Sequence, residues 1–170
     1  FRITGEYGSG LAVAGGMGCA PVFFLIARLA EAGKEVTLLW GTRTAGEFFD
    51  TGYMKKRGVK VRFATGDGSR GHHGPVTELL HEAMGAMRDS YRGFVCGPEP
   101  MLQAVQRLVR GEKAAWQVSV EERMACGLGL CVGCVVRNVR GGYDMACKDG
   151  PVFDLKEIEF ESVEEAAKDY

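Results

Sequence analysis

The sequence predicts an α/β fold, a five-stranded parallel sheet with helices on both faces, followed by a small cysteine-rich hairpin domain. The first observation is that short apolar runs typical of buried strands alternate with stretches of helical apolar spacing up to about residue 120. The second is that glycine-rich loops follow several of these runs, at the same edge of the expected sheet. The third is that the alternation stops after residue 120, where four cysteines fall between residues 126 and 147. Alternating strands and helices with short connections favour a parallel sheet covered on both faces.

The expected elements follow from apolar periodicity and from the positions of proline and glycine. Pro21 and Pro75 each stand where a helix can begin without losing a hydrogen bond. Apolar residues at helical spacing, such as Val76, Leu79 and Leu80, predict which face of a helix is buried. We expect strands at 11–14, 35–40, 59–64, 93–96 and 116–120, helices at 21–32, 75–88 and 101–110, a short helical segment at 46–56, and a hairpin formed by 135–140 and 143–145.

The chain is expected to divide into three parts. Residues 1–120 would form a nucleotide-binding domain, because the alternation of strands and helices is confined to them. Residues 121–153 would form a small domain that carries the cysteines. Residues 154–170 are acidic, and we expect them to be a loosely helical, solvated tail.

The composition is that of an ordinary globular protein. The 170 residues are 46% hydrophobic and 25% charged, with a net charge of −1. No excess of basic residues argues for nucleic acid or an anionic membrane, and no run of about 18 apolar residues could span a bilayer. Four of the six cysteines cluster at ligand spacing, which is typical of cytosolic proteins rather than of a secreted disulfide framework. We therefore expect a cytoplasmic protein with no nucleic-acid or membrane partner.

The first glycine-rich loop runs from Gly15 to Pro21, between a predicted strand and a predicted helix. In this context glycines let a pyrophosphate approach backbone amides at a helix N-terminus. The loop does not complete the G-x-G-x-x-G pattern, because Pro21 occupies the last position. A tight turn between a strand and a helix also needs glycine, so this loop alone leaves both interpretations open.

Two later loops favour nucleotide binding. Asp67 and Ser69 could hydrogen-bond a ribose, and an acidic side chain there favours NADH. Arg43 and Arg70 would instead suit the 2′-phosphate of NADPH. Cys96 ends the fourth predicted strand, and its thiol could lie against a nicotinamide ring. The alternative for Cys96 is a buried residue with a packing role.

The cysteines of the C-terminal part follow the spacing C-x4-C-x2-C-x12-C. C-x4-C-x2-C with a distal cysteine is the spacing of plant-type 2Fe–2S ferredoxins. Gly127, Gly129 and Gly133 suit a loop that turns backbone N–H groups toward a negatively charged cluster. Structural zinc also takes four thiolates but usually shows paired knuckles, so zinc and disulfides remain alternatives. The candidate metal ligands are Cys126, Cys131, Cys134 and Cys147.

These motifs, with the flanking stretches 121–127 and 147–153, resemble the iron–sulfur branch of the ferredoxin–NADP reductase-like flavoproteins. Within that family they are similar to the electron transfer subunit of dihydroorotate dehydrogenase B. The resemblance implies a ferredoxin reductase-like NAD-binding domain, a 2Fe–2S cluster on the four cysteines and a role in pyrimidine biosynthesis. It also implies a heteromeric complex with a flavin-containing dehydrogenase subunit.

The resemblance further implies the residues of the nucleotide site. Cys96 would lie on the nicotinamide side, as a candidate catalytic residue. Cys19 departs from the family pattern, in which a smaller or aliphatic residue is commoner. The residues implied to bind NAD(H) or NADP(H) are Gly15, Gly16, Gly18, Ala20, Pro21, Thr42, Arg43, Asp67, Gly68, Ser69, Cys96, Gly97, Pro98 and Met101.

Members of this family carry an N-terminal β-barrel with an Arg-x-Tyr-Ser-type flavin motif, which this sequence does not show. NADH gives up two electrons as hydride and a 2Fe–2S cluster accepts one, so a flavin is the usual converter. We therefore expect a C-terminal fragment of an NADH-dependent oxidoreductase that passes electrons through FAD and the cluster to dihydroorotate dehydrogenase. One alternative is the small subunit of an NADH-dependent ferredoxin–NADP oxidoreductase or of a sulfide dehydrogenase. The other is a zinc-stapled nucleotide-binding scaffold without redox chemistry.

Overall fold

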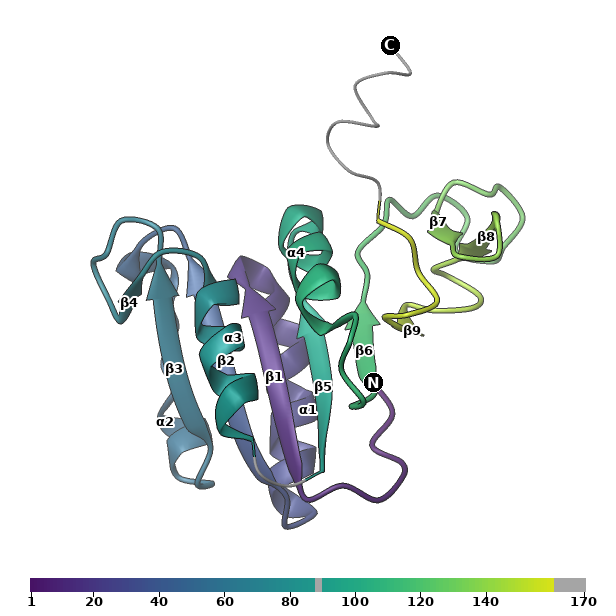
Figure 1. Ribbon diagram of the computed structural model, residues 1–170. Helices are drawn as coiled ribbons and strands as arrows, with labels where there is room; N and C mark the ends of the chain where they lie inside the picture. The colour runs from purple at the N-terminus through teal and green to yellow at the C-terminus, as the bar shows by residue number, and fades with distance from the viewer. Residues whose placement is uncertain (88–89, 161–170) are drawn as a thin grey trace.

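A seven-stranded sheet forms the centre of the protein (Figure 1). The computed structural model describes residues 1–87 and 90–160 of the chain. Neighbouring strands lie in the order β4 (His72–His73), β3 (Lys60–Thr65), β2 (Glu35–Thr42), β1 (Ser9–Gly15), β5 (Tyr91–Cys96), β6 (Trp116–Ser119) and β9 (Val152–Asp154).

The five strands predicted from the sequence, β1, β2, β3, β5 and β6, all pair in parallel. This pairing confirms the predicted α/β class. Two further strands were not predicted. β4 extends the parallel arrangement beyond β3, whereas β9 pairs antiparallel with β6. Through β9, the C-terminal part of the chain returns to the edge of the central sheet.

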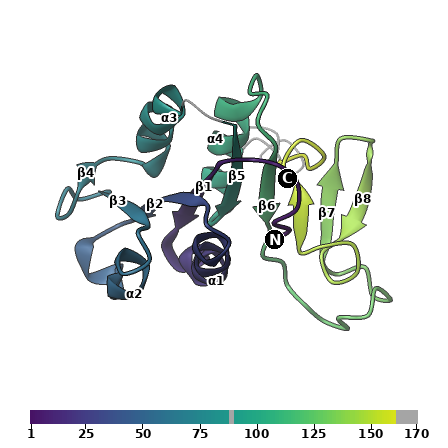
Figure 2. The same ribbon diagram turned by 90° about the horizontal axis from the view of Figure 1, so that it is seen from below.

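Helices cover both faces of the sheet, as predicted. α1 (Cys19–Glu31) and α2 (Gly52–Lys55) lie on one face, and α3 (Val76–Ala86) and α4 (Glu99–Val109) lie on the other (Figure 2). A short 3-10 turn, η1 (Gly16–Gly18), follows β1 directly. A second one, η2 (Ala45–Glu47), follows shortly after β2. Within residues 1–87 and 90–160, none of the helices combines the length and the apolar composition that a membrane crossing requires.

The buried face of α3 is the one that the apolar spacing predicts. Val76, Leu79 and Leu80 are buried at the i, i+3, i+4 positions of an amphipathic helix. α1 begins at Cys19 rather than at the predicted Pro21. Pro21 lies in the first turn, where a missing N–H removes no hydrogen bond within the helix.

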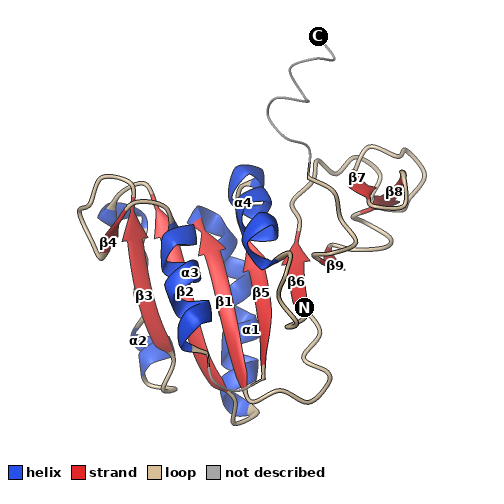
Figure 3. Cartoon of the chain, in the orientation of Figure 1, coloured by secondary structure: helices blue, strands red, loops and turns tan. Residues whose placement is uncertain are grey.

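The cysteine-rich part contains the predicted hairpin, in which β7 (Val135–Asn138) and β8 (Gly142–Met145) pair antiparallel. The rest of this part is mostly loop (Figure 3). The pairing continues past the strand ends, since the Ala146 N–H donates to the Cys134 carbonyl at 2.9 Å. Cys134 and Cys147, which are far apart in the sequence, therefore meet at the open end of the hairpin.

The expected solvated, loosely helical tail is wrong for residues 154–160. Asp154 ends β9, and residues 155–160 contain no helix. Leu155 and Ile158 are 1% and 0% exposed, because they pack into the same apolar core as β6 and the hairpin. Because the residues around them are charged and largely acidic, the composition of this segment does not indicate that Leu155 and Ile158 are buried. Residues 161–170 of the expected tail lie outside the described part of the chain.

The central sheet and the cysteine-rich part share one apolar core. The cluster on the α3–α4 face of the sheet continues from β6 into Cys134, Val136 and Phe153. The cysteine hairpin is therefore packed against the sheet rather than tethered to it by a free linker. The division into domains at residue 120 stays a prediction.

Replacing Ile158 by alanine should destabilise the protein, because the side chain is fully buried. We expect the free energy of unfolding to fall by about 2–5 kcal/mol, as for other large-to-small substitutions in a core. Guanidinium unfolding followed by circular dichroism measures the change. The matched control is Glu157→Ala at the exposed neighbouring position, with an expected effect within about 0.5 kcal/mol. Equal effects of the two substitutions would contradict the packing of this segment.

Candidate functional site

The loops after β1 and β5 meet at the point where the strand order reverses. From β1 the chain builds the sheet outward through β2, β3 and β4, and then returns to β5 on the other side of β1. The loops at the carboxyl ends of β1 and β5 therefore leave the sheet in opposite directions. In parallel α/β sheets, ligands bind in the crevice that this reversal creates.

The two loops touch through their backbones, which only glycine allows. A Cβ atom on Gly18 would collide with the Cys96 carbonyl oxygen and lie 2.8 Å from Gly97 Cα. Gly16 has a φ of 52°, in the left-handed region. The Trp40 indole N–H of β2 donates to the Gly16 carbonyl at 3.2 Å and holds the loop from the other side. The first glycine loop is thus fixed against both neighbouring strands.

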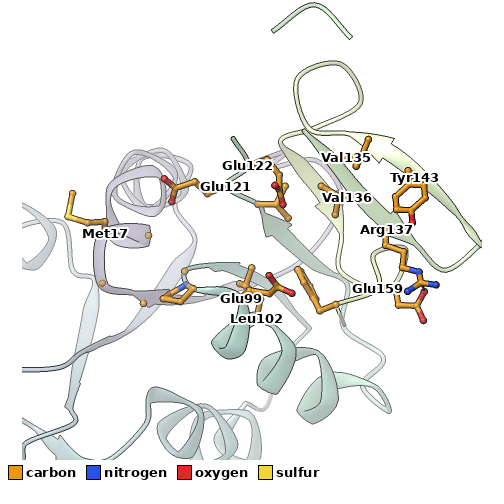
Figure 4. Close-up of a pocket in the computed structure, with 17 residues that line it drawn as sticks. Met17, Glu99, Leu102, Glu121, Glu122, Val135, Val136, Arg137, Tyr143 and Glu159 are labelled. Carbon is orange, nitrogen blue, oxygen red and sulfur yellow. Dashed lines mark ion pairs between the residues drawn. The ribbon is translucent and has the colours of Figure 1, made fainter. Parts of the chain in front are cut away.

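A cavity of about 600 Å³ opens beside these loops, between the sheet and the cysteine hairpin (Figure 4). The glycine loops form one wall, and residues of β7, β8 and the C-terminal segment form the opposite wall. The lining residues are Gly15, Gly16, Met17, Gly18, Gly97, Pro98, Glu99, Leu102, Val120, Glu121, Glu122, Val135, Val136, Arg137, Tyr143, Glu159 and Phe160.

The charged residues of the cavity lining are mainly acidic, which the sequence analysis missed. Glu99, Glu121 and Glu122 lie along it, and Glu159 pairs with Arg137 at 3.4 Å. Partial burial and the Glu99 carboxylate raise the pKa of Glu122. A signal was available, because Glu121 and Glu122 follow directly after β6, where parallel sheets place their ligand-binding side chains.

Five of the predicted nucleotide-binding residues line this cavity: Gly15, Gly16, Gly18, Gly97 and Pro98. Three others lie just behind or beside the lining. The Met101 side chain fills the space in front of Gly15 and Gly97, where a Cβ on either glycine would meet its sulfur or its methyl group. Ala20 and Pro21 are exposed in the first turn of α1. Their contact with a nucleotide stays a prediction.

Cys96 does not line the cavity, and its thiol is buried at the end of β5. Burial raises the pKa of Cys96, against the opposing effect of a hydrogen bond with Ser119. Burial, with Cys96 nearby, raises the pKa of Cys19 to about 12. Both thiols therefore stay protonated at neutral pH and belong to the core on the α1 face. The nicotinamide-side role of Cys96 stays a prediction.

The remaining predicted residues lie at the carboxyl ends of β2 and β3. Asp67 accepts hydrogen bonds from the Ser69 hydroxyl at 2.5 Å and from the Ser69 N–H at 3.0 Å. These bonds lower the pKa of Asp67. The Ser69 hydroxyl accepts a bond from the Ala45 N–H at 2.8 Å, and Arg43 pairs with Glu47 at 3.2 Å. Thr42 is the last residue of β2, and Gly68 lies in the loop after β3.

The loop of residues 124–134, which we call the cysteine loop, directs backbone N–H groups at one sulfur atom, Cys126 Sγ. The N–H groups of Leu128, Leu130 and Cys131 each lie 3.4 Å from Cys126 Sγ. These donors lower the pKa of Cys126 to about 6, since each stabilises the thiolate. The Gly129 N–H also contributes a bond to the Cys147 thiol. The loop therefore supplies the donors that a thiolate-bound, negatively charged group needs.

Left-handed residues produce this arrangement. Gly127 and Gly129 have φ values of 65° and 76°, as expected for the predicted role of glycine in the loop. The third left-handed residue of this loop is Val132, with a φ of 49°, whereas Gly133 has no positive φ. A β-branched residue in this region is strained. Strain of this kind persists where the surroundings impose the conformation, and it clusters at functional sites.

The four cysteine thiols are arranged as two pairs. Cys126 lies in hydrogen-bond contact with Cys131, and Cys134 with Cys147. In the described residues, no three histidine, cysteine or carboxylate side chains converge closely enough for a single metal ion. A 2Fe–2S cluster places two ligands on each of two irons, whereas structural zinc places all four on one ion. The pairs and their amide donors thus fit a binuclear cluster better than zinc.

The surface of the cysteine loop is apolar. Leu128 and Leu130 are 75% and 80% exposed, and Met124 and Val132 are exposed beside them. Exposed apolar side chains are normal when scattered, but a group of them on one loop indicates a surface that another molecule covers. Cys131 is exposed in the same loop.

Two known families match the chain, in the order that the fold suggests. Residues 12–107 match the family described as "Oxidoreductase NAD-binding domain". Residues 121–159 match the family described as "Iron-sulfur cluster binding domain of dihydroorotate dehydrogenase B". The second match extends through the segment that contains Leu155 and Ile158, in agreement with its burial against the hairpin.

Curated relatives carry names that agree with these families. The dihydroorotate dehydrogenase B (NAD(+)) electron transfer subunit homolog of Aquifex aeolicus is 35% identical over 148 residues, which are 87% of this chain and 57% of that protein. The electron transfer subunit of Caldanaerobacter subterraneus is 38% identical over 172 residues, with coverage of 94% and 66%. The chain thus spans about 57–66% of the length of these two relatives.

Solved structures show the same fold. The chain is similar to one in a structure described as "Insights into flavin-based electron bifurcation via the NADH-dependent reduced ferredoxin-NADP oxidoreductase structure", with a TM-score of 0.77 and 27% identity. That likeness covers 97% of this chain and 62% of the other. The chain therefore belongs to the ferredoxin reductase-like oxidoreductases with an NAD-binding domain, in the iron–sulfur group that contains the electron transfer subunits of dihydroorotate dehydrogenase B.

Proposed function

We propose that residues 1–170 form the nucleotide- and cluster-binding part of an electron transfer subunit that serves a dehydrogenase. NADH would bind at the cavity beside the glycine loops, and electrons would leave through a 2Fe–2S cluster on the four cysteines. One observation carries the proposal. The cavity that the glycine loops open is closed on its far side by the hairpin that holds the cysteines. A single cavity therefore borders both the glycine loops of the sheet and the hairpin that begins directly after Cys134.

The charges of the cavity support one orientation of the nucleotide. The pyrophosphate would lie on the glycine loop at the N-terminus of α1, where backbone amides favour an anion. The wall near Glu121 and Glu122 is negative and would repel it. The nicotinamide end would therefore face the hairpin, and the adenosine would extend toward Asp67 and Ser69. Asp67 at the ribose favours NADH over NADPH.

The cysteine loop would hold the cluster through groups that are already in place. The N–H groups that donate to Cys126 Sγ stabilise its thiolate form. The hairpin keeps Cys134 beside Cys147. When bound, the cluster supplies one-electron transfer at a potential that hydrogen bonds and exposure tune. The exposed position of Cys131 would bring the cluster close to the surface.

We further propose that FAD, bound by a part of the protein outside residues 1–170, converts between the two electrons of NADH and the single electrons of the cluster. The curated relatives are named electron transfer subunits of dihydroorotate dehydrogenase B, and we propose the catalytic dehydrogenase subunit as the partner. The partner would cover the apolar surface of Leu128 and Leu130. An electron donor and its acceptor must come close, and this surface lies directly over the cysteines.

A second candidate is the small subunit of an NADH-dependent ferredoxin–NADP oxidoreductase. The structural likeness with a TM-score of 0.77 favours it. The same nucleotide site and the same cluster would serve both functions, and only the partner differs. Purifying the protein with its native partner and testing dihydroorotate against reduced ferredoxin as electron donor would separate the two.

Removing any one of the four cysteines should remove the cluster. Cys126→Ser, Cys131→Ser, Cys134→Ser and Cys147→Ser should each lose most of the bound iron and sulfide, because serine replaces a thiolate ligand by a weaker hydroxyl. Anaerobic purification, iron and sulfide assays, and electron paramagnetic resonance of the reduced protein measure the loss. Cys96→Ser is the control and should keep its iron, since Cys96 lies in the core. One zinc and no iron in the unaltered protein would support the scaffold alternative.

Gly18→Ala should weaken NADH binding. The added Cβ would collide with the Cys96 carbonyl and push apart the two loops that frame the cavity. Because displacements of about 1 Å can change rates and affinities by large factors, we expect the dissociation constant to rise at least about tenfold. Titration calorimetry measures it. In the control Gly85→Ala, nothing lies within 4 Å of the new Cβ, and we expect normal affinity with slightly higher stability. Normal NADH binding by Gly18→Ala would show that the nucleotide binds elsewhere on the protein.

Leu130→Asp should weaken association with the partner subunit, because a charge would enter an apolar contact. We expect the dissociation constant of the complex to rise at least about tenfold, as at a typical interface hot spot. Analytical ultracentrifugation or surface plasmon resonance measures it. Val139→Asp is the matched control, since Val139 is also exposed but lies at the turn end of the hairpin. Equal loss in both variants would place the docking surface away from the cysteine loop.

A further inference from the structure

The segment of residues 155–160, which we call the C-terminal strap, is bonded to α4 mainly through one side chain, that of Gln106. The Gln106 amide nitrogen donates to the Leu155 carbonyl at 2.7 Å and to the Ile158 carbonyl at 2.6 Å. A side-chain amide has two N–H groups, and both are used here. Gln103, one turn earlier, donates a longer bond of 3.5 Å to the Phe160 carbonyl. The strap contains no helix, so these bonds take the place of a regular element in fixing its path.

The strap is in turn tied to the cysteine hairpin. The Val139 N–H donates to the Glu157 carbonyl at 3.0 Å, and the Glu159 N–H donates to the Arg137 carbonyl at 2.9 Å. These bonds form an isolated antiparallel bridge along the outer edge of β7. The Glu159 carboxylate also pairs with the Arg137 side chain. β7 begins directly after Cys134, so the strap holds the strand that carries one of the cysteines.

One stripe of α4 touches both the cavity and the strap. Glu99 and Leu102 line the cavity, while Gln103 and Gln106 bond the strap. The spacing of these four residues, at i, i+3, i+4 and i+7, places them on one face of the helix. Glu159 and Phe160 of the strap line the cavity from the opposite wall. The contacts therefore run without a break from the loop after β5, through α4 and the strap, to β7.

We propose that Gln106 is a positioning residue that fixes, through the strap, the separation between the nucleotide cavity and the cysteine hairpin. The inference rests on the proposed function, since a fixed separation matters where electrons must pass between the two. Gln106 touches neither the cavity nor the cysteines. Its two bonds to strap carbonyls act together with the bond from the Leu155 N–H to the Trp116 carbonyl of β6, at 2.9 Å, and with the bonds to the edge of β7.

Hydrogen exchange tests the positioning role without depending on the cluster or on NADH. In the full-length protein with its native partner, Gln106→Leu keeps the size and the helix propensity of the side chain but removes both donors. Losing two hydrogen bonds should speed exchange of the peptides that cover residues 135–160 by about tenfold. Peptides of β1 and β5 should exchange as in the unaltered protein, which shows that the fold is intact. Gln106→Lys, whose ammonium can donate to both carbonyls, should restore slow exchange.

The matched control is Gln117→Leu. Gln117 is also a glutamine whose amide makes two short backbone bonds, from the Arg2 N–H at 2.8 Å and to the Arg2 carbonyl at 2.7 Å. These bonds hold the N-terminal arm rather than the strap. Exchange of residues 135–160 should therefore stay slow in this variant.

Rapid-mixing kinetics give a second readout that loss of stability alone would not produce. In Gln106→Leu, NADH-driven reduction of the cluster should slow by about tenfold while the KM for NADH stays unchanged, because positioning changes and binding does not. Gln106→Lys should recover the rate. If NADH reduces no cluster in the unaltered protein, the proposed function fails, and the exchange experiment alone still decides the positioning role. Unchanged exchange in Gln106→Leu, or equal acceleration in Gln117→Leu, would overturn it.

Discussion

The antiparallel pairing of β9 with β6 decides where the cysteines lie. Val118 pairs with Phe153 and Ser119 with Val152, so the chain returns to the sheet after the hairpin. Without this return, the segment after β6 would leave the carboxyl edge of the sheet with nothing to direct it. With it, the hairpin folds back beside the glycine loops and shares their cavity. The glycine loops of the sheet and the β7–β8 hairpin become walls of one cavity because three residues of β9 extend the sheet.

Local physical signals made most of the sheet and the cysteine spacing predictable. The spacing of Val76, Leu79 and Leu80 fixes a helix face within a single turn, and the glycines fix the loops at the strand ends. β9 and the strap had no such signal. Leu155 and Ile158 lie among charged residues, and what buries them is far away in the sequence: β6, α4 and the hairpin. Burial that depends on distant partners cannot be read from a local pattern.

The residues of the candidate site likewise fall into those that local sequence predicts and those that only tertiary packing brings together. The glycine loops were predictable because close backbone contact allows no other residue, as at Gly18. The acidic wall was missed although Glu121 and Glu122 follow a strand, because Glu99, which lies near Glu122, belongs to α4 and approaches it only in the folded chain. The left-handed conformation of Val132 could not be predicted from the sequence, because a β-branched residue disfavours it. The sequence thus indicated which residue types the site needs, and the tertiary packing decided which of them meet.

The six cysteines show how surroundings give one side chain two chemistries. Cys19 and Cys96 are removed from water, and burial raises the pKa of both thiols, which favours the protonated form. Cys126 stays near the surface, where three backbone N–H groups lower its pKa to about 6. Desolvation opposes the thiolate form of a cysteine, and hydrogen-bond donors directed at the sulfur favour it. Desolvation dominates at Cys19 and Cys96, and the donors dominate at Cys126. Cys134 is buried as well, but it lies beside Cys147 at the end of the hairpin, so position together with exposure decides which thiols can share a metal cluster.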